Sequence, residues 1–198
     1  MPTYTVTAVL MRHGHRERCG TNRLMTDLGR RQVRAVGKKL LRNFQFCRVF
    51  ASKSDRAIEI AQIVSGRQGV ISKESLGFSD LLPTREIKGA KKIRAAKWKA
   101  GGIVTIGDWE SWAPEYYAAV RKHFGQAVLG AAIESAEECG NCSILIGNHS
   151  PLLELLIDDP STPTIGVAGI VVYTIQVDNG SAKIVNSEVL FKGWRLKW

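Results

Sequence analysis

The chain has 198 residues, of which 44% are hydrophobic and 23% charged, and its formal net charge is +10. This composition is typical of a globular protein with a sizeable core and excludes a disordered chain. No apolar run approaches the ~18–20 residues that cross a bilayer, so an integral membrane protein is also excluded. The charge is divided unevenly: residues 1–100 hold 22 basic and seven acidic side chains, whereas residues 101–198 hold six and 11.

The four cysteines are too few and too scattered for a disulfide scaffold. Cys139 and Cys142 form a single C-x-x-C pair, which could be a redox pair or half of a zinc site. Because no second pair accompanies it, reduced thiols are the favoured interpretation. The stretch Met1–Thr5 lacks a basic flank, so no signal peptide is expected and the predicted location is cytoplasmic.

The first half alternates between strand and helix signals. We expect a buried strand over residues 4–11, then a helix from an N-cap at Thr26 to about residue 42. A short strand over 48–51, a helix over 55–64 and a possible strand at 70–71 follow.

The second half begins with residues 75–112, which are less regular and carry glycines as breakers. A long helix is predicted from Pro114, a buried strand over 143–147 and another helix from Ser150-Pro151. The last two strands, 170–177 and 183–191, flank the hairpin signal Asp178-Asn179-Gly180.

This order of elements predicts an α/β fold: a three-layer α/β/α sandwich with a mostly parallel sheet and an antiparallel edge. We expect a single domain over residues 1–198, with an insert at about 75–112. The order of the strands within the sheet is not readable from the pattern.

Basic and imidazole side chains follow three of the predicted strands, where open α/β folds bind ligands. Arg12, His13, His15 and Arg16 follow the first strand, and Ser52 to Arg56 follow the second. Asn148, His149 and Ser150 follow the strand that ends at Gly147. Among these residues Asp55 is the one carboxylate. Arginine forks and helix N-termini suit phosphate, so a phosphate site is predicted at this edge.

Four segments in order resemble the histidine phosphatase superfamily, which has the phosphoglycerate mutase-like fold. Leu10 to Gly14 is similar to its R-H-G signature, and Leu24 to Gln32 to its L-T-x-x-G-x-x-Q segment. Phe50 to Ala57 resembles its S-x-x-x-R-A stretch, and Ile144 to His149 the strand that ends in its second histidine. The resemblance spans residues 6–157.

The resemblance implies a phosphatase in which His13 attacks phosphorus and becomes a phosphohistidine. Arg12, Arg56 and His149 would bind the phosphoryl oxygens, with Ser52 and Arg16 nearby. Asp80 best matches the position of the family's general acid, and Glu86 and Glu74 are its competitors. No cofactor and no metal are implied, and the substrate would be a phosphorylated small molecule or a phosphoprotein.

Two departures from the family pattern bear on function. His15 stands where the family commonly has a carboxylate or amide, and its role is open. Ser150 follows the second histidine where the acid-phosphatase branch has an Asp, which favours the branch of mutases, sugar-phosphate phosphatases and phosphohistidine phosphatases. The mutases' acidic segment has only a faint counterpart around Trp109, so a phosphatase is favoured over a mutase.

Three alternatives remain beside the phosphatase. The first is a mutase-type phosphotransferase, and the second is a metal-dependent hydrolase that uses His13 and His15 as ligands. The third is a non-catalytic module that docks a polyanion or acidic partner through Lys88–Lys99, within a segment of seven basic residues and one acidic residue over 85–99. The aromatic side chains near that segment either line a substrate lid or pack the insert; they are Trp98, Trp109, Trp112, Tyr116 and Tyr117.

Overall fold

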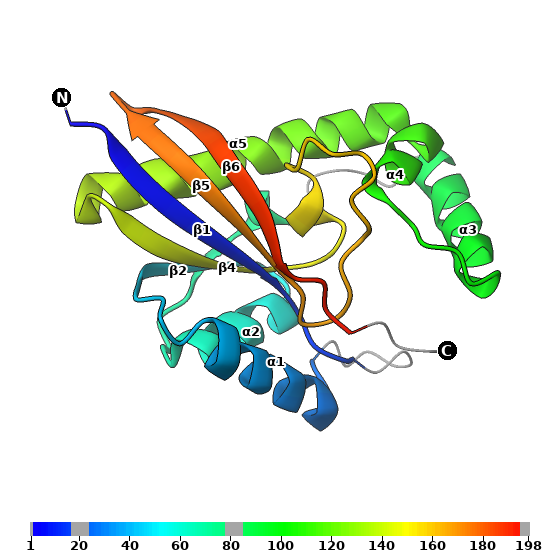
Figure 1. Ribbon diagram of the computed structural model, residues 1–198, viewed down its shortest axis with the longest axis horizontal. Helices are drawn as coiled ribbons and strands as arrows, with labels where there is room; N and C mark the ends of the chain where they lie inside the picture. The colour runs from blue at the N-terminus through cyan, green and yellow to red at the C-terminus, as the bar shows by residue number, and fades with distance from the viewer. Residues whose placement is uncertain (1, 17–23, 78–84, 195–198) are drawn as a thin grey trace.

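The computed structural model describes residues 2–16, 24–77 and 85–194, and within these residues six strands form one mixed sheet (Figure 1). The strands are β1 (Tyr4–Arg12), β2 (Phe46–Ser52), β3 (Ile71–Lys73), β4 (Cys142–Asn148), β5 (Ile170–Asp178) and β6 (Ser181–Phe191), in the spatial order β3-β2-β4-β1-β5-β6. The first four in this order pair in parallel, and β5 and β6 pair antiparallel at one edge. The predicted mostly parallel sheet with an antiparallel edge is therefore confirmed.

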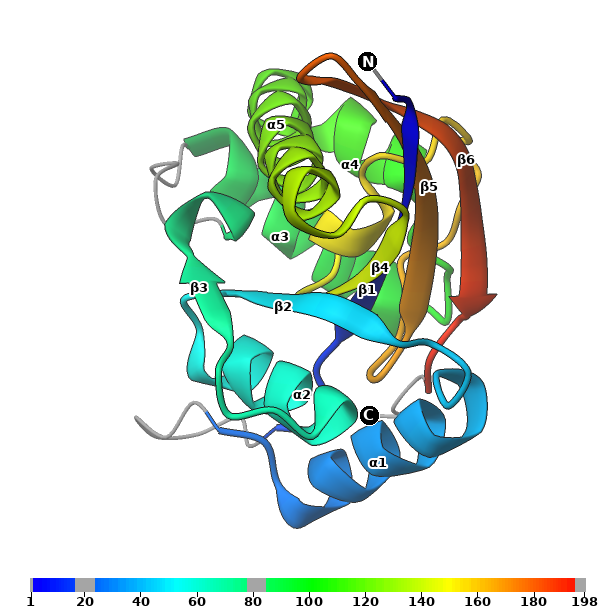
Figure 2. The ribbon, with the colours of Figure 1, turned by 90° about the vertical axis from the view of Figure 1, so that its left-hand side faces the viewer.

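Helices cover both faces of this sheet (Figure 2). On one face lie α1 (Asp27–Leu40) and α2 (Asp55–Ser65), which bury Val33, Val36 and Ile60. On the other lies α5 (Pro114–Cys139), whose small residues Ala131, Ala132 and Ala136 pack in a second core. The predicted three-layer arrangement is thus observed. In the described part of the chain, no helix combines the length and apolarity needed to span a membrane.

The hairpin between β5 and β6 turns where the sequence signal predicted. Asn179 and Gly180 both have positive φ, 48° and 73°. A two-residue turn with two positive φ angles matches the right-handed twist of the flanking strands, and Asn-Gly accepts these angles at low cost.

The predicted helix from Ser150-Pro151 is wrong. A short 3-10 turn, η2 (Leu152–Glu154), stands there instead and buries all three of its residues. A longer helix would have needed a polar face, whereas this turn is enclosed on every side, and Pro160 and Pro163 interrupt the chain soon after.

The insert at 75–112 is more regular than the glycine pattern suggested. It contains η1 (Glu74–Leu76), α3 (Arg85–Lys99) and α4 (Ile106–Trp112), with a capping box between Thr105 and Asp108 at the start of α4. This reciprocal pair satisfies two backbone N–H groups and so lets a seven-residue helix begin sharply.

Part of the basic segment in α3 holds the insert together. The guanidinium of Arg94 lies 4.8 Å from the ring centre of Trp98 and 5.3 Å from that of Trp109. Lys97 donates to both carboxylate oxygens of Asp108, at 2.8 and 2.6 Å. Trp109 and Tyr117 are buried in the core. These contacts support packing, rather than a lid, as the role of the two aromatic residues.

Candidate functional site

Three neighbouring strands end at one edge of the sheet. β1 ends at Arg12, β2 at Ser52 and β4 at Asn148, and Arg12 lies directly opposite Asn148 in the parallel register. Because the carboxyl ends of parallel strands meet, the polar residues that follow them share one crevice. The phosphate site predicted from the sequence lies at this edge.

The structure brings the two predicted histidines together there. The rings of His13 and His149 lie edge to face, with centroids 5.3 Å apart and an interplanar angle of 66°. Arg12 and Arg56 are close enough to both imidazoles to lower their pKa values electrostatically, and Arg16 acts on His149 in the same way. Four of the predicted residues therefore surround His149.

The proton of His13 is held on one ring nitrogen. Nδ1 of His13 lies 2.7 Å from the carbonyl oxygen of Gly14. A carbonyl oxygen can only accept, so Nδ1 carries the hydrogen and Nε2 of the neutral ring keeps its lone pair. The side chain is only 5% exposed, which holds this orientation.

Burial keeps both imidazoles uncharged. Desolvation lowers the pKa of His13 well below its usual value, and the neighbouring His149 and the charge of Arg12 lower it further. Desolvation followed by repulsion from Arg56 and Arg12 lowers the pKa of His149 to about 3. At neutral pH the site therefore combines two neutral imidazoles with arginine charges.

The backbone beside His13 lies against the start of α1. A Cβ on Gly14 would overlap the carbonyl oxygen of Gly29, so glycine is required at this close approach. The amide of His15 donates to Oε1 of Gln32 at 2.9 Å, and Thr26 donates its backbone N–H to the His15 carbonyl at 3.0 Å. The first helix thus fixes the loop that presents His13.

Arg12 is held from the opposite side by a buried carboxylate that the sequence analysis did not single out. Arg12 donates through Nη1 to the Ile165 carbonyl oxygen, and the Ile165 amide donates to Oε1 of Glu154 at 2.8 Å. The Ser150 hydroxyl donates to the same oxygen at 2.5 Å. Glu154 therefore positions Ile165, the residue whose carbonyl oxygen accepts from Arg12.

The charges of Glu154 and Arg12 affect each other. Desolvation lowers the pKa of Arg12 to about 10, the Glu154 carboxylate opposes this shift, and Arg94, Arg16 and Arg56 add to it. Burial raises the pKa of Glu154, although Ser150, Ile165 and Arg12 counter the effect. Nε of Arg12 is buried without an acceptor among the described residues, which leaves a donor position for an anion.

The remaining predicted residues lie around this centre. Ser52 is buried at the end of β2, and Arg16 is exposed beyond β1. His15 turns to Thr26, with Nδ1 2.9 Å from its Oγ1. Glu74 pairs with Lys53 at 2.8 Å. Asp80 and the side chain of Glu86 lie outside the described residues.

Asn148, which lies among the polar residues predicted at the strand ends, was given no role by the sequence analysis. Its Nδ2 donates to the Leu76 carbonyl at 2.7 Å, and its Oδ1 accepts from the His149 amide at 2.8 Å. The signal was present as a polar residue within a buried strand, because such a residue needs partners. Asn148 therefore ties the chain just before residues 78–84 to the strand that presents His149.

The hypothesis of a metal site on His13 and His15 gains no support from the geometry. The two side chains turn to different partners, Gly14 and Thr26. Within residues 2–16, 24–77 and 85–194, no three His, Cys, Asp or Glu side chains are grouped to hold an ion. Cys139 and Cys142, the alternative ligands or redox pair, are free thiols whose pKa values burial raises.

Comparison with known proteins shows the family to which the chain belongs. A sequence profile described as the histidine phosphatase superfamily (branch 1) matches residues 8–157, which contain all four segments of the resemblance. The chain belongs to the histidine phosphatase superfamily, branch 1. A comparison with curated protein sequences gives no match.

Several solved protein structures share the fold of this chain. The chain is similar to a phosphoglycerate mutase from Bacillus anthracis str. Sterne, with a TM-score of 0.61, 18% identity and 92% of each chain covered. It is similar to a mycobacterial glucosyl-3-phosphoglycerate phosphatase, with a TM-score of 0.63, 18% identity, and 92% of this chain and 97% of that one covered.

A third similar structure is a phosphoserine phosphatase mutant from Entamoeba histolytica in complex with phosphoserine. Its TM-score is 0.57 at 16% identity, and the alignment covers 94% of this chain and 98% of that one. At these identities the likeness confirms the phosphoglycerate mutase-like fold, with phosphatases and a mutase among its neighbours.

The neutral histidines make stability depend on pH. The unfolded chain binds protons near pH 6.5 that folded His13 and His149 exclude, so the free energy of unfolding should fall as the pH is lowered from 7 to 5. Each histidine contributes a slope of up to about 1.4 kcal/mol per pH unit. Urea unfolding of wild type and His149→Gln at both pH values tests this, and equal slopes in the two proteins would contradict it.

Glu154 should act on anion binding through position. In Glu154→Gln the amide oxygen still accepts from Ile165 and Ser150, whereas Glu154→Ala leaves both donors without it. We expect the dissociation constant for inorganic phosphate, measured by calorimetry, to rise about 10-fold in the alanine variant and less than about 3-fold in the glutamine variant. The same loss in both would assign the effect to charge instead.

Proposed function

We propose that this histidine phosphatase superfamily member hydrolyses phosphomonoesters or phosphohistidine through a phosphohistidine intermediate on His13. The observation that carries the proposal is the neutral His13 ring, which holds its proton on Nδ1 against Gly14 and keeps its Nε2 lone pair among arginine side chains. A nucleophile needs that lone pair, and a phosphoryl group needs that positive surrounding.

The reaction is a double displacement. Nε2 of His13 attacks phosphorus while the bond between phosphorus and the leaving group breaks, and a carboxylic acid protonates the leaving atom. Water then attacks the phosphohistidine, the P–N bond breaks, and the carboxylate takes the proton of that water. Inorganic phosphate leaves, and both His13 and the acid return to their starting states.

Three side chains are proposed to bind the phosphoryl oxygens. Arg12 offers its buried Nε, Arg56 lies in the first turn of α2, and His149 faces His13. The N-terminus of an 11-residue helix adds a positive dipole end beside Arg56. The charges of the two arginines and the positive helix end stabilise the transferring group as the bond to the leaving group lengthens.

Asp80 remains the proposed general acid. Support comes from the Asn148 side chain, which ties Leu76, four residues before Asp80 in the sequence, to the end of β4 next to His149. Glu74 is a weaker candidate because it already pairs with Lys53. Glu86 is the other competing candidate, and it is the second residue of α3 (Arg85–Lys99).

Two other functions remain possible on the same fold. A mutase would pass the phosphoryl group to a second hydroxyl instead of water, so it would release little inorganic phosphate. A binding module would use the basic α3, where Lys88, Lys91, Lys92 and Lys99 stay exposed. Steeply salt-dependent binding of nucleic acid without turnover of any phosphomonoester would favour the module.

Replacement of His13 tests the nucleophile. We expect His13→Ala to lower the rate of p-nitrophenyl phosphate hydrolysis by at least about 10³-fold, because no intermediate can form. His123→Ala, which removes a histidine from α5, is the matched control and should keep the wild-type rate. Rapid quenching in alkali should trap a phosphoenzyme in wild type and none in His13→Ala. Equal hydrolysis by wild type and His13→Ala would refute the mechanism.

The leaving group identifies the acid. Nitrophenolate departs without a proton, whereas an alkoxide needs one, so Asp80→Asn should slow an alkyl phosphate about 10²–10⁴-fold and p-nitrophenyl phosphate far less. Glu74→Gln and Glu86→Gln should leave the ratio of the two rates unchanged. A selective loss in either glutamate variant would transfer the role to that residue.

A further inference from the structure

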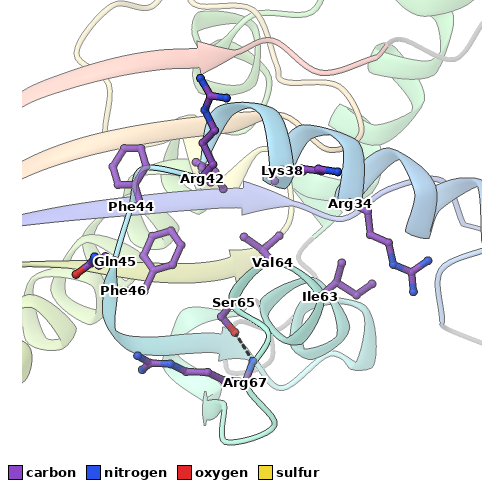
Figure 3. A pocket seen from close by; sticks show the side chains of 12 residues that line it. Arg34, Lys38, Arg42, Phe44, Gln45, Phe46, Ile63, Val64, Ser65 and Arg67 are labelled. Carbon is purple, nitrogen blue, oxygen red and sulfur yellow. Dashed lines mark hydrogen bonds between the residues drawn. The ribbon is translucent and has the colours of Figure 1, made fainter.

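A groove lies between the carboxyl-terminal halves of α1 and α2, closed at one end by the segment before β2 (Figure 3). It encloses about 710 Å³, which is within the range of small-molecule sites. Its floor is apolar and includes Ile63, Val64 and Phe46. The groove therefore has the size and the mixed lining of a ligand site.

This groove is separate from the site around His13. α1 touches the His13 loop through its first turn, at Gly29, but lines the groove through Arg34, Gly37 and Lys38 in its second half. Phe46, which also lines it, is the first residue of β2, whereas Ser52 at the phosphate edge is the last. Seven residues of strand span about 20 Å, so the two sites lie at opposite ends of the sheet.

The side chains that line the groove carry charge of one sign only. Arg34, Lys38, Arg42 and Arg67 line it, and no carboxylate does. Each of the four is exposed, and none pairs with an acidic side chain among the described residues. The two helix carboxyl ends contribute about half a negative charge each, so four positive charges leave a clear positive excess.

Aromatic rings stand beside these charges. Phe44 and Phe46 are stacked, with centroids 5.9 Å apart and an interplanar angle of 9°. Phe46 is buried, whereas Phe44 stays half-exposed at the end of the stack. Figure 3 shows both rings to the left of Arg42, with Arg34 on the other side of Val64 and Ile63. A planar ring placed on Phe44 would continue this stack inside the groove that the four cations also line.

We propose that this groove binds a nucleotide. The base stacks on Phe44, and the phosphates are bound by Arg34, Lys38, Arg42 and Arg67. Proteins bind single-stranded nucleic acid without sequence preference by stacking bases on aromatic rings within a cationic groove. A single nucleotide offers the same two groups, a base and its phosphates. The proposal also accounts for positive charge of the first half that the His13 site does not use.

Amide chemical shifts of the full chain locate the binding. Titration with ADP should shift amides within residues 34–46 and 63–67. Shifts confined to residues 12–16 and 147–151 would mean that ADP occupies only the candidate phosphatase site, and the proposal would be wrong. Because this readout needs no turnover, it is independent of the proposed enzymatic function.

Paired variants test the two halves of the ligand. The double variant Arg34→Ala/Arg42→Ala should weaken ADP binding at least about 10-fold, since it removes two charge-assisted contacts. Its control, Arg31→Ala/Lys39→Ala, removes the same charge from exposed positions of α1 outside the groove. An equal loss in the control would reduce the effect to general electrostatics and overturn the site.

Phe44→Leu keeps an apolar side chain but removes the ring. We expect it to weaken ADP about 5-fold or more while leaving the affinity for inorganic phosphate unchanged. Adenosine alone should bind far more weakly than ADP. If phosphate binds as tightly as ADP and Phe44→Leu changes neither, the groove is a simple anion site and the nucleotide assignment fails. If a single-stranded oligonucleotide binds far more tightly than ADP, the ligand is a nucleic acid strand and the assignment to a nucleotide is wrong.

Discussion

Arg12, His13 and His149 lie together where desolvation and mutual repulsion both oppose positive charge. The protein resolves this conflict by leaving the two imidazoles neutral and by placing one buried carboxylate, Glu154, behind Arg12. A fully balanced set of ion pairs would leave little attraction for a phosphoryl dianion. The positive charge of the site is therefore only partly balanced within the described residues, and under the proposed function the phosphoryl group would supply the missing negative charge.

Two of the sequence segments that identify the family are physically one unit. The glycine of the R-H-G segment, Gly14, touches the glycine of the next segment, Gly29, and Gln32 of that segment caps the His15 amide. The two glycines allow backbones to meet without side chains between them, and the glutamine satisfies an amide in the loop that follows His13. Segments 15 residues apart are thus required together because they form a single contact.

Local patterns predicted the hairpin, the N-cap at Thr26, the strand ends and the residues that converge there. They failed where the structure depends on long-range packing. The strand order and the Asn148 bond to Leu76 join distant parts of the chain, and no local period encodes them. The local pattern predicted a helix where the short turn Leu152–Glu154 lies. It also gave no reason to single out Glu154, because a carboxylate is ordinarily expected in solvent, whereas Glu154 is buried.

Gly147 precedes Asn148 and His149 on β4, and a Cβ there would overlap the carbonyl oxygen of Ala57. The missing side chain lets the first turn of α2 rest directly against the strand, and Arg56 is the residue before Ala57 in that turn. A residue with no functional group therefore sets the spacing between Arg56 and His149. The candidate site is shaped by excluded volume as much as by charge, so a survey of its charged positions alone would describe only part of it.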